Sequence, residues 1–144
     1  MMPFEEYLRR GIVTRSNKDT QRAEYLMIEA ERKLSSLQEK IDKIGVRDDN
    51  ANDYVEHCYD ILMFLLRAKL FREGYSCSGL GAHEAEVSFM ANLGFSDTDI
   101  HVVDSLRYFR NGILYYGKRF DKEYAEKTIT FTKKAYRRLR AVLG

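Results

Sequence analysis

The residue types that could act on a phosphate group are concentrated between Leu106 and Gly117. Read as a helix, this stretch places Arg107, Arg110 and Asn111 three or four residues apart, so their side chains share one face. A guanidinium group can donate hydrogen bonds to two phosphate oxygens at once, and an amide can orient a phosphate or a ribose. The stretch therefore predicts a binding site for the phosphate of a nucleotide or of RNA.

Two tyrosines and two basic residues end the same stretch. The tyrosines are Tyr115 and Tyr116, and a phenol, with a pKa of about 10, is a poor base at neutral pH. A phenol can still donate a hydrogen bond and stack on a nucleic-acid base. Lys118 and Arg119 would widen the positive patch around the arginines. We therefore expect the tyrosines to take part in recognising a nucleotide or RNA rather than in fast cleavage of RNA. In the alternative interpretation, one tyrosine packs in the core and the other covers the end of the bundle.

The order of these residues resembles a known signature. Arg110 and Asn111, three intervening residues, and then Tyr115, Tyr116 and Gly117 resemble the signature helix of HEPN domains, which are small all-α domains associated with nucleotides and RNA. In that family an arginine, often followed by asparagine, precedes a histidine by four to six residues, and the pair forms an RNase site in the active members. Here the signature histidine is replaced. The chain's histidines all lie outside the required range: His57, His83 and His101.

The resemblance implies a HEPN-like protein that binds a nucleotide or RNA and is catalytically degenerate. It also implies a homodimer or a nucleotidyltransferase partner, as in toxin–antitoxin and defence systems. The residues expected to contact the ligand are Arg107, Arg110, Asn111, Tyr116 and Lys118. We favour a binding protein over an enzyme because the histidine is missing.

Two alternatives from other function classes stay open. One is an active, metal-independent endoribonuclease in which Arg110 stabilises the pentavalent phosphate and Asn111 positions it. Tyr115 or Tyr116 would then transfer the proton. The other alternative is a structural or interaction bundle without a ligand, in which the arginines form salt bridges and apolar helix faces build a dimer interface.

A second histidine-bearing segment precedes the signature helix. His83 follows the sequence Gly79-Leu80-Gly81, where free backbone N–H groups at a helix start would favour an anion. A cap-and-turn role is the better explanation, because Glu84 and Glu86 beside the histidine would repel phosphate.

The elements that must position these residues are predicted from helical periodicity. The pattern predicts a single all-α domain over residues 1–144, with a leading segment at 1–15 and a bundle at 16–144. The expected architecture is an up-and-down four-helix bundle with one additional short helix. The predicted helices span residues 3–10, 18–44, 53–73, 83–93, 97–116 and 121–143.

Three of these helices carry informative patterns. Residues 53–73 are apolar on nearly all sides, which predicts a central helix. Apolar residues repeat in steps of four and three along residues 23–44 and 120–142, as in bundle seams. The second seam consists of Phe120, Tyr124, Thr128, Phe131, Ala135, Leu139 and Val142. No alternating run of β-branched residues predicts a strand.

Composition limits the class of protein. With 44% hydrophobic and 32% charged residues the chain is globular, and a net charge of +2 requires no nucleic-acid partner by itself. Cys58 and Cys77 lack the spacing of a metal site or disulfide framework, so we predict no metal, no cofactor and a cytoplasmic location. Glu5 and Glu6 argue against a secretory signal, and the longest apolar run, residues 61–66, is too short to span a membrane.

Overall fold

The structure is a computed structural model that describes residues 1–144, except for the side chains of Leu114 and Tyr115. The elements in chain order are α1 (Phe4–Arg9), β1 (Val13–Arg15), α2 (Thr20–Ile44), α3 (Ala51–Glu73), β2 (Tyr75–Cys77), α4 (Ala82–Ser88), the 3₁₀ helix η1 (Phe89–Leu93), α5 (Asp97–Tyr116) and α6 (Lys122–Leu143). The all-α prediction is confirmed, and the helix bounds agree with the predicted ones within two residues, apart from the 3₁₀ end of the short helix. None of the described helices combines the length and apolar character that a bilayer crossing requires.

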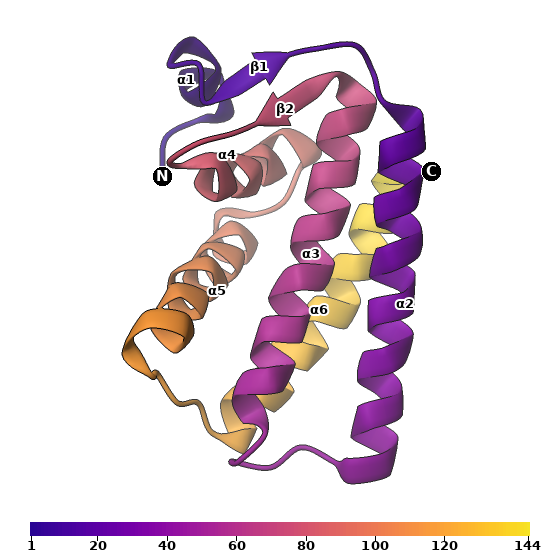
Figure 1. Ribbon diagram of the computed structural model, residues 1–144, viewed down its shortest axis with the longest axis vertical. Helices are drawn as coiled ribbons and strands as arrows, with labels where there is room; N and C mark the ends of the chain where they lie inside the picture. Colours follow the sequence, from indigo (N-terminus) through magenta and orange to yellow (C-terminus); the bar gives the residue numbers. More distant parts are fainter.

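Helix α3 lies at the centre of the molecule, as its all-round apolar pattern predicts. Ile61, Leu62, Leu65 and Leu66 on successive faces of α3 are fully buried. Figure 1 shows α2 and α6 beside α3, and both helices pack against it in one hydrophobic core.

The buried face of α6 differs from the predicted seam. Thr128, Ala135 and Leu139 are buried as predicted, but Val142 is exposed. The remaining buried positions of α6 are Ala125, Ile129, Thr132 and Leu143. The larger aromatic residues of the predicted seam, Phe120, Tyr124 and Phe131, are only half-buried.

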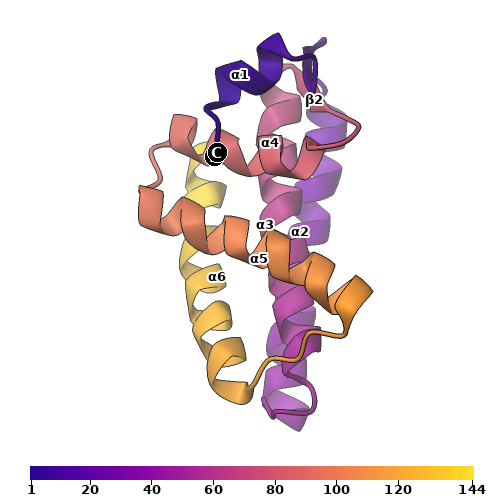
Figure 2. The same ribbon diagram turned by 90° about the vertical axis from the view of Figure 1, so that its left-hand side faces the viewer.

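Helix α5 crosses the other helices instead of running parallel to them. Figure 2 shows α5 passing obliquely in front of α3 and α6. Among the described side chains of α5, only those of Val103 and Leu106 are fully buried, while those of Phe109 and Ile113 are half-buried. The predicted up-and-down four-helix bundle is thus not confirmed: α2, α3 and α6 lie side by side, and α5 crosses them.

A two-stranded ribbon, which the sequence pattern did not predict, ties the N-terminal segment to the body. Strand β1 pairs antiparallel with β2, with Val13 opposite Cys77 and Arg15 opposite Tyr75. Each strand has three residues, too few for an alternating pattern to be recognised. Beneath the ribbon, the leading segment and the body share a second hydrophobic cluster. Its buried members are Phe4, Tyr7, Val13, Leu70, Ala85 and Phe89.

Gly74 makes the turn from α3 into β2 possible. Its φ of +82° is in the left-handed region, and a Cβ at this position would lie 2.7 Å from the carbonyl oxygen of Ser16. The Gly74 carbonyl also accepts a hydrogen bond from the Ser16 N–H at 2.8 Å. The close approach of these two backbones therefore requires glycine and fixes where the chain enters the loop before α4.

Candidate functional site

Three of the predicted site residues line a cleft between α5 and the loop that precedes α4. We call it the arginine cleft; its volume is about 480 Å³. Arg107, Arg110 and Asn111 form the α5 side, Tyr59 of α3 contributes a wall, and residues 79–84 form the opposite side. The predicted grouping of two arginines and an amide on one helix face is therefore present beside a cavity.

Each arginine in the cleft is held by one carboxylate. Arg110 donates from Nη1 to Asp60 Oδ1 at 2.6 Å, and Arg107 donates from Nε to Asp104 Oδ1 at 2.8 Å. Among the described residues, the terminal nitrogens of Arg107 and Nη2 of Arg110 have no hydrogen-bond partner. The ion pairs thus orient the two guanidinium groups and leave N–H donors for a ligand. The two carboxylates also neutralise part of the positive charge of the cleft.

Tyr59 lies under Arg110 and was not predicted from sequence. The Arg110 guanidinium carbon is 5.5 Å from the centre of the Tyr59 ring, within cation–π range. Burial raises the pKa of Tyr59 to about 12, so the phenol is neutral at physiological pH. Asp60, next in sequence, is one of several charged residues of α3, so nothing in the sequence singles it out as the partner of Arg110.

His83 lies in the same cleft, on the side opposite the arginines. Its side chain is 64% exposed, and its Nδ1 is 2.9 Å from Oε1 of Glu86, which is 4% exposed. Arg67 donates to Glu86 from Nε at 2.6 Å and from Nη2 at 3.2 Å. Burial alone would raise the pKa of Glu86, but the hydrogen bonds from His83 and Arg67 outweigh burial and bring the pKa below its ordinary value.

The two glutamates of α4, which were expected to repel phosphate, lie in different surroundings. Glu86 does not line the cleft, and Arg67 balances its charge. Glu84 does line the cleft and accepts a hydrogen bond from the Tyr7 hydroxyl at 2.7 Å. The leading segment thus reaches the site through Tyr7, a contact that no local pattern in the sequence indicates.

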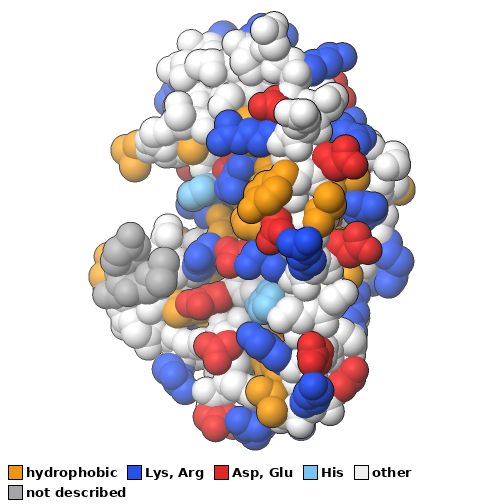
Figure 3. All heavy atoms as spheres, turned by 45° about the vertical axis from the view of Figure 1, so that its right-hand side comes forward, with side chains coloured by type: hydrophobic (Ala, Val, Ile, Leu, Met, Phe, Trp, Pro, Cys, Tyr) orange, Lys and Arg blue, Asp and Glu red, His pale blue; other side chains and the backbone are white. Residues whose placement is uncertain are grey.

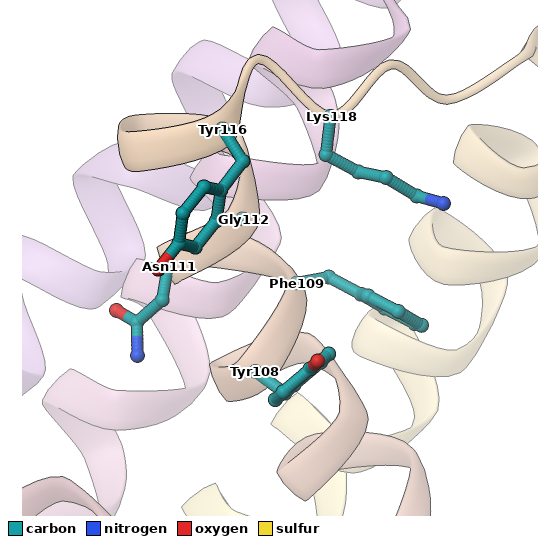
Figure 4. Close-up of a pocket in the computed structure, with 6 residues that line it drawn as sticks. All are labelled: Tyr108, Phe109, Asn111, Gly112, Tyr116 and Lys118. Atoms are coloured by element: carbon teal, nitrogen blue, oxygen red, sulfur yellow. The ribbon is translucent and has the colours of Figure 1, made fainter.

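A second cavity, of about 690 Å³, lies on the other side of Asn111 and is rich in aromatic residues. We call it the aromatic cleft. Its described lining consists of Tyr108, Phe109, Asn111, Gly112, Tyr116 and Lys118. In Figure 4 the Tyr116 ring and the Asn111 amide lie on one side of Gly112, and Lys118 and Phe109 lie on the other. Tyr108 and Tyr116 are 67% and 87% exposed, which leaves their rings accessible to a ligand.

The connection between α5 and α6 positions Lys118. The Asn52 side chain donates to the Lys118 carbonyl at 2.7 Å and accepts from the Phe120 N–H at 2.8 Å. The Lys118 N–H donates to the Gly112 carbonyl at 3.2 Å, so the chain folds back on α5. Lys118 Nζ then lies 5.8 Å from the ring centres of Phe109 and Phe120.

The predicted site residues are therefore distributed over two adjoining cavities. Arg107 and Arg110 line the arginine cleft, Tyr116 and Lys118 line the aromatic cleft, and Asn111 lines both. The predicted role of the Tyr115 side chain lies outside the described residues.

The surface around the site carries charges of both signs. Figure 3 shows acidic and basic side chains interspersed over one face, with a hollow at its edge where a histidine and basic side chains lie. Within the described part of the chain, no group of three or more histidine, cysteine, aspartate or glutamate side chains is placed to hold a metal ion. Comparisons with protein-family models, with curated proteins and with solved structures give no match.

Proposed function

We propose that the protein binds single-stranded RNA or a nucleotide, with a phosphate in the arginine cleft and a base in the aromatic cleft. The observation that supports this proposal is the position of Asn111, which lines both cavities. A nucleotide presents a phosphate and a base within a few ångströms of each other. Two adjoining cavities, one with guanidinium donors and one with exposed aromatic rings, match that chemistry.

The phosphate contact is supported by the unused donors of Arg107 and Arg110. Because Asp60 and Asp104 offset part of the positive charge, the contact depends on the geometry of the guanidinium groups rather than on a strong positive field. We therefore expect the affinity for RNA to fall with salt, but with the shallow slope of few phosphate contacts.

The base contact is supported by Tyr108 and Tyr116, two large aromatic side chains that are mostly in contact with solvent. Stacking a base on an aromatic ring contributes about 1–3 kcal/mol and tolerates different bases. Lys118 beside the rings could pair with a second phosphate of a longer strand. A single-stranded ligand fits better than a duplex, whose bases are already stacked.

Binding of a fluorescently labelled single-stranded RNA oligonucleotide, followed by anisotropy, tests the proposal. We expect Arg110→Ala and Tyr116→Ala each to weaken binding at least about tenfold, since a charge-assisted contact or a stacked base is removed. The matched controls lie on α2, far in sequence from the clefts: Arg32→Ala and Tyr25→Ala, whose side chains are also exposed. Unchanged affinity in Arg110→Ala and Tyr116→Ala, or equal losses in the α2 variants, would contradict the proposal.

The proposal includes what the resemblance to HEPN domains implies about assembly. In that family two copies commonly face each other along the signature helix, and some members act with a nucleotidyltransferase in toxin–antitoxin pairs. Here α5 crosses the body with its second half accessible, which leaves room for a second copy. The homodimer and the nucleotidyltransferase partner stay predictions, and the molar mass from light scattering tests the first of them.

A further inference from the structure

The aromatic cleft continues into a third cavity at the start of α6. This cavity has a volume of about 430 Å³, and we call it the lysine cleft. Phe109 and Lys118 line both the aromatic cleft and the lysine cleft, as Asn111 lines both the arginine cleft and the aromatic cleft. The three cavities therefore follow one another from the loop before α4, across the end of α5, to the first turns of α6.

The lysine cleft is lined by three exposed basic side chains, Lys118, Arg119 and Lys127. Among the described residues, Lys118 and Arg119 form no salt bridge. Nζ of Lys127 is 3.2 Å from Oε1 of Glu123, but both side chains of this pair are 75% exposed. An ion pair so exposed is weak, so all three cations can contact a phosphate.

The lysine cleft also contains aromatic rings that are linked to the aromatic cleft. Phe120 and Tyr124 are stacked, with ring centres 4.4 Å apart and ring planes inclined by 16°. Phe109 packs with its ring edge-on to both, at 5.3 Å and 6.1 Å between ring centres. The three rings are half-buried and keep part of their surface accessible. A surface of aromatic rings therefore runs from one cleft into the next.

Acidic side chains limit how far the positive surface extends. Asp121 and Glu123 also line the lysine cleft, where the basic side chains outnumber them, and Oδ1 of Asp121 accepts a hydrogen bond from a backbone N–H of α6 at 2.8 Å. In the cavity beyond Arg119, three carboxylates accompany that single cation: Asp48, Asp49 and Asp121. Carboxylates in excess repel a phosphate, so the surface suited to an anion ends at Arg119.

We propose that the three clefts form one continuous track for a single strand of RNA, so that the ligand is an extended oligonucleotide rather than a free nucleotide. This inference rests on the proposed function, which leaves both ligands open, and adds a contact region on α6. Beyond the base in the aromatic cleft, Lys118 contacts the next phosphate. The following base stacks on Phe120 and Tyr124, and the phosphate after it lies between Arg119 and Lys127.

The alternation of charged and aromatic groups carries this assignment. A nucleic-acid strand presents a phosphate, a base and again a phosphate, and proteins that bind single strands combine cations along the backbone with rings for the bases. A mononucleotide fills the first two clefts only and leaves the lysine cleft empty. Each further nucleotide binds as part of the same molecule, so its contacts add to the affinity without a new association step.

Competition binding with the full-length protein tests the length of the ligand. Uridine monophosphate and oligouridylates of two, three and six nucleotides displace a labelled strand of six nucleotides, and anisotropy follows the displacement. We expect the affinity to rise at least about 100-fold from the mononucleotide to the longest strand. The number of positions at which a longer strand can bind one site accounts for only about sixfold of this gain.

Variants of the lysine cleft separate it from the other two clefts. Arg119→Ala and Lys127→Ala should each weaken binding of the longest strand at least about threefold and leave the affinity for the mononucleotide unchanged. Each should also lower the slope of log affinity against log salt concentration by about 0.7, the value of one phosphate contact on a single strand. The matched controls are Arg137→Ala and Lys134→Ala, which remove the same charges from exposed positions of α6 outside the three clefts.

The part played by the rings is tested with a strand of the same length that lacks its bases. Its phosphates are the same, so a track that used charge alone would bind it equally well. We expect binding at least about tenfold weaker, since stacking is lost at each base. Equal affinity for the two strands would contradict the track of alternating contacts. Circular dichroism establishes that the variants, all of exposed side chains, are folded.

The remaining outcomes distinguish this inference from the proposed function. If the longest strand binds no more than about sixfold more tightly than the mononucleotide, the track is overturned and the binding of a nucleotide stands. Equal losses for both ligands in Arg119→Ala and Lys127→Ala, or equal losses in the control variants, also overturn the track. No binding of any of these ligands by the wild type overturns both proposals.

Discussion

At the scale of single residues, the site depends on how charges are paired. Arg67 and Glu86 form the most buried ion pair that a described carboxylate makes, with the carboxylate 4% and the arginine 30% exposed. A buried carboxylate is tolerated only when its oxygens are satisfied, and here Arg67 and His83 supply three hydrogen bonds. The same contacts that make Glu86 stable therefore also fix the imidazole at the cleft.

Glu86→Gln should lower the free energy of unfolding at neutral pH by about 2 kcal/mol, because Arg67 loses its charged partner. Because the Arg67–Glu86 pair is only partly exposed, we expect its loss to cost more than that of a surface ion pair but less than that of a fully buried one. Urea denaturation measures the change. Glu39→Gln is the control: its ion pair with Lys43 is largely exposed, and its loss should cost less than about 0.5 kcal/mol.

The same variant has an expected dependence on pH. The pKa of Glu86 is lowered in the folded protein, so its stabilising effect is complete above the ordinary glutamate pKa of about 4.3 and is lost as the pH falls through the lowered value. The difference in unfolding free energy between the wild type and Glu86→Gln should therefore shrink as the pH falls below about 4. A difference that stays constant into acid would contradict the lowered pKa.

At the scale of elements, short connections determine where the cleft forms. The loop before α4 is held at one end by the ribbon, where the Ser78 N–H donates to the Ile12 carbonyl at 3.1 Å. At the other end it enters α4, which carries His83 and Glu86. The turn at Gly74 determines where β2 begins. A changed backbone conformation at this turn would therefore shift the ribbon and the cleft wall that follows it.

Gly74→Ala should cost at least about 2 kcal/mol, because an alanine adds left-handed strain of about 1 kcal/mol and a collision with the Ser16 carbonyl. Gly94→Ala separates the two effects. Its φ of +83° is nearly the same, but a Cβ there would meet nothing within 4 Å, so only the strain should appear. Thermal and urea unfolding measure both variants, and equal losses would show that the collision is relieved at no cost.

At the scale of the whole molecule, the leading segment and α4 share a small core apart from the main one. The Phe4 ring centre lies 4.7 Å from that of Phe89 and 5.1 Å from that of Tyr75. This cluster is separate from the larger one around α3. The stability of the site thus depends on a core that the first residues of the chain complete.

Phe4→Ala should lower the free energy of unfolding by about 3 kcal/mol, since it removes a buried ring and leaves a cavity. We also expect faster amide hydrogen exchange in the ribbon and α4, with little change in the part of α3 before Leu70, whose buried residues belong to the main core. Tyr25→Ala, an exposed aromatic on α2, should change stability by less than about 0.5 kcal/mol. Uniformly faster exchange throughout the chain would mean that the two clusters unfold as one.

Features that depend on interactions between near neighbours in the sequence were predictable, and features that depend on distant residues were not. The helices were predictable because apolar spacing and glycines act over a few neighbouring residues, and the same local spacing placed Arg107, Arg110 and Asn111 together. The ribbon was not predictable, because Val13 and Cys77 pair although the whole of α2 and α3 lies between them in the sequence. The place of His83 beside the arginines was missed for the same reason: a signature defined by spacing along one helix cannot include a residue of another.

The ribbon also has a consequence for the newly synthesised chain. Residues 4–15 are synthesised before the segments against which they pack. Those segments, Tyr75–Cys77 and Phe89, are made only after α2 and α3 are complete. Contacts between such distant segments form late because a long loop must first be closed. We therefore expect a nascent chain to fold its central helices while its arginine cleft is still unfinished.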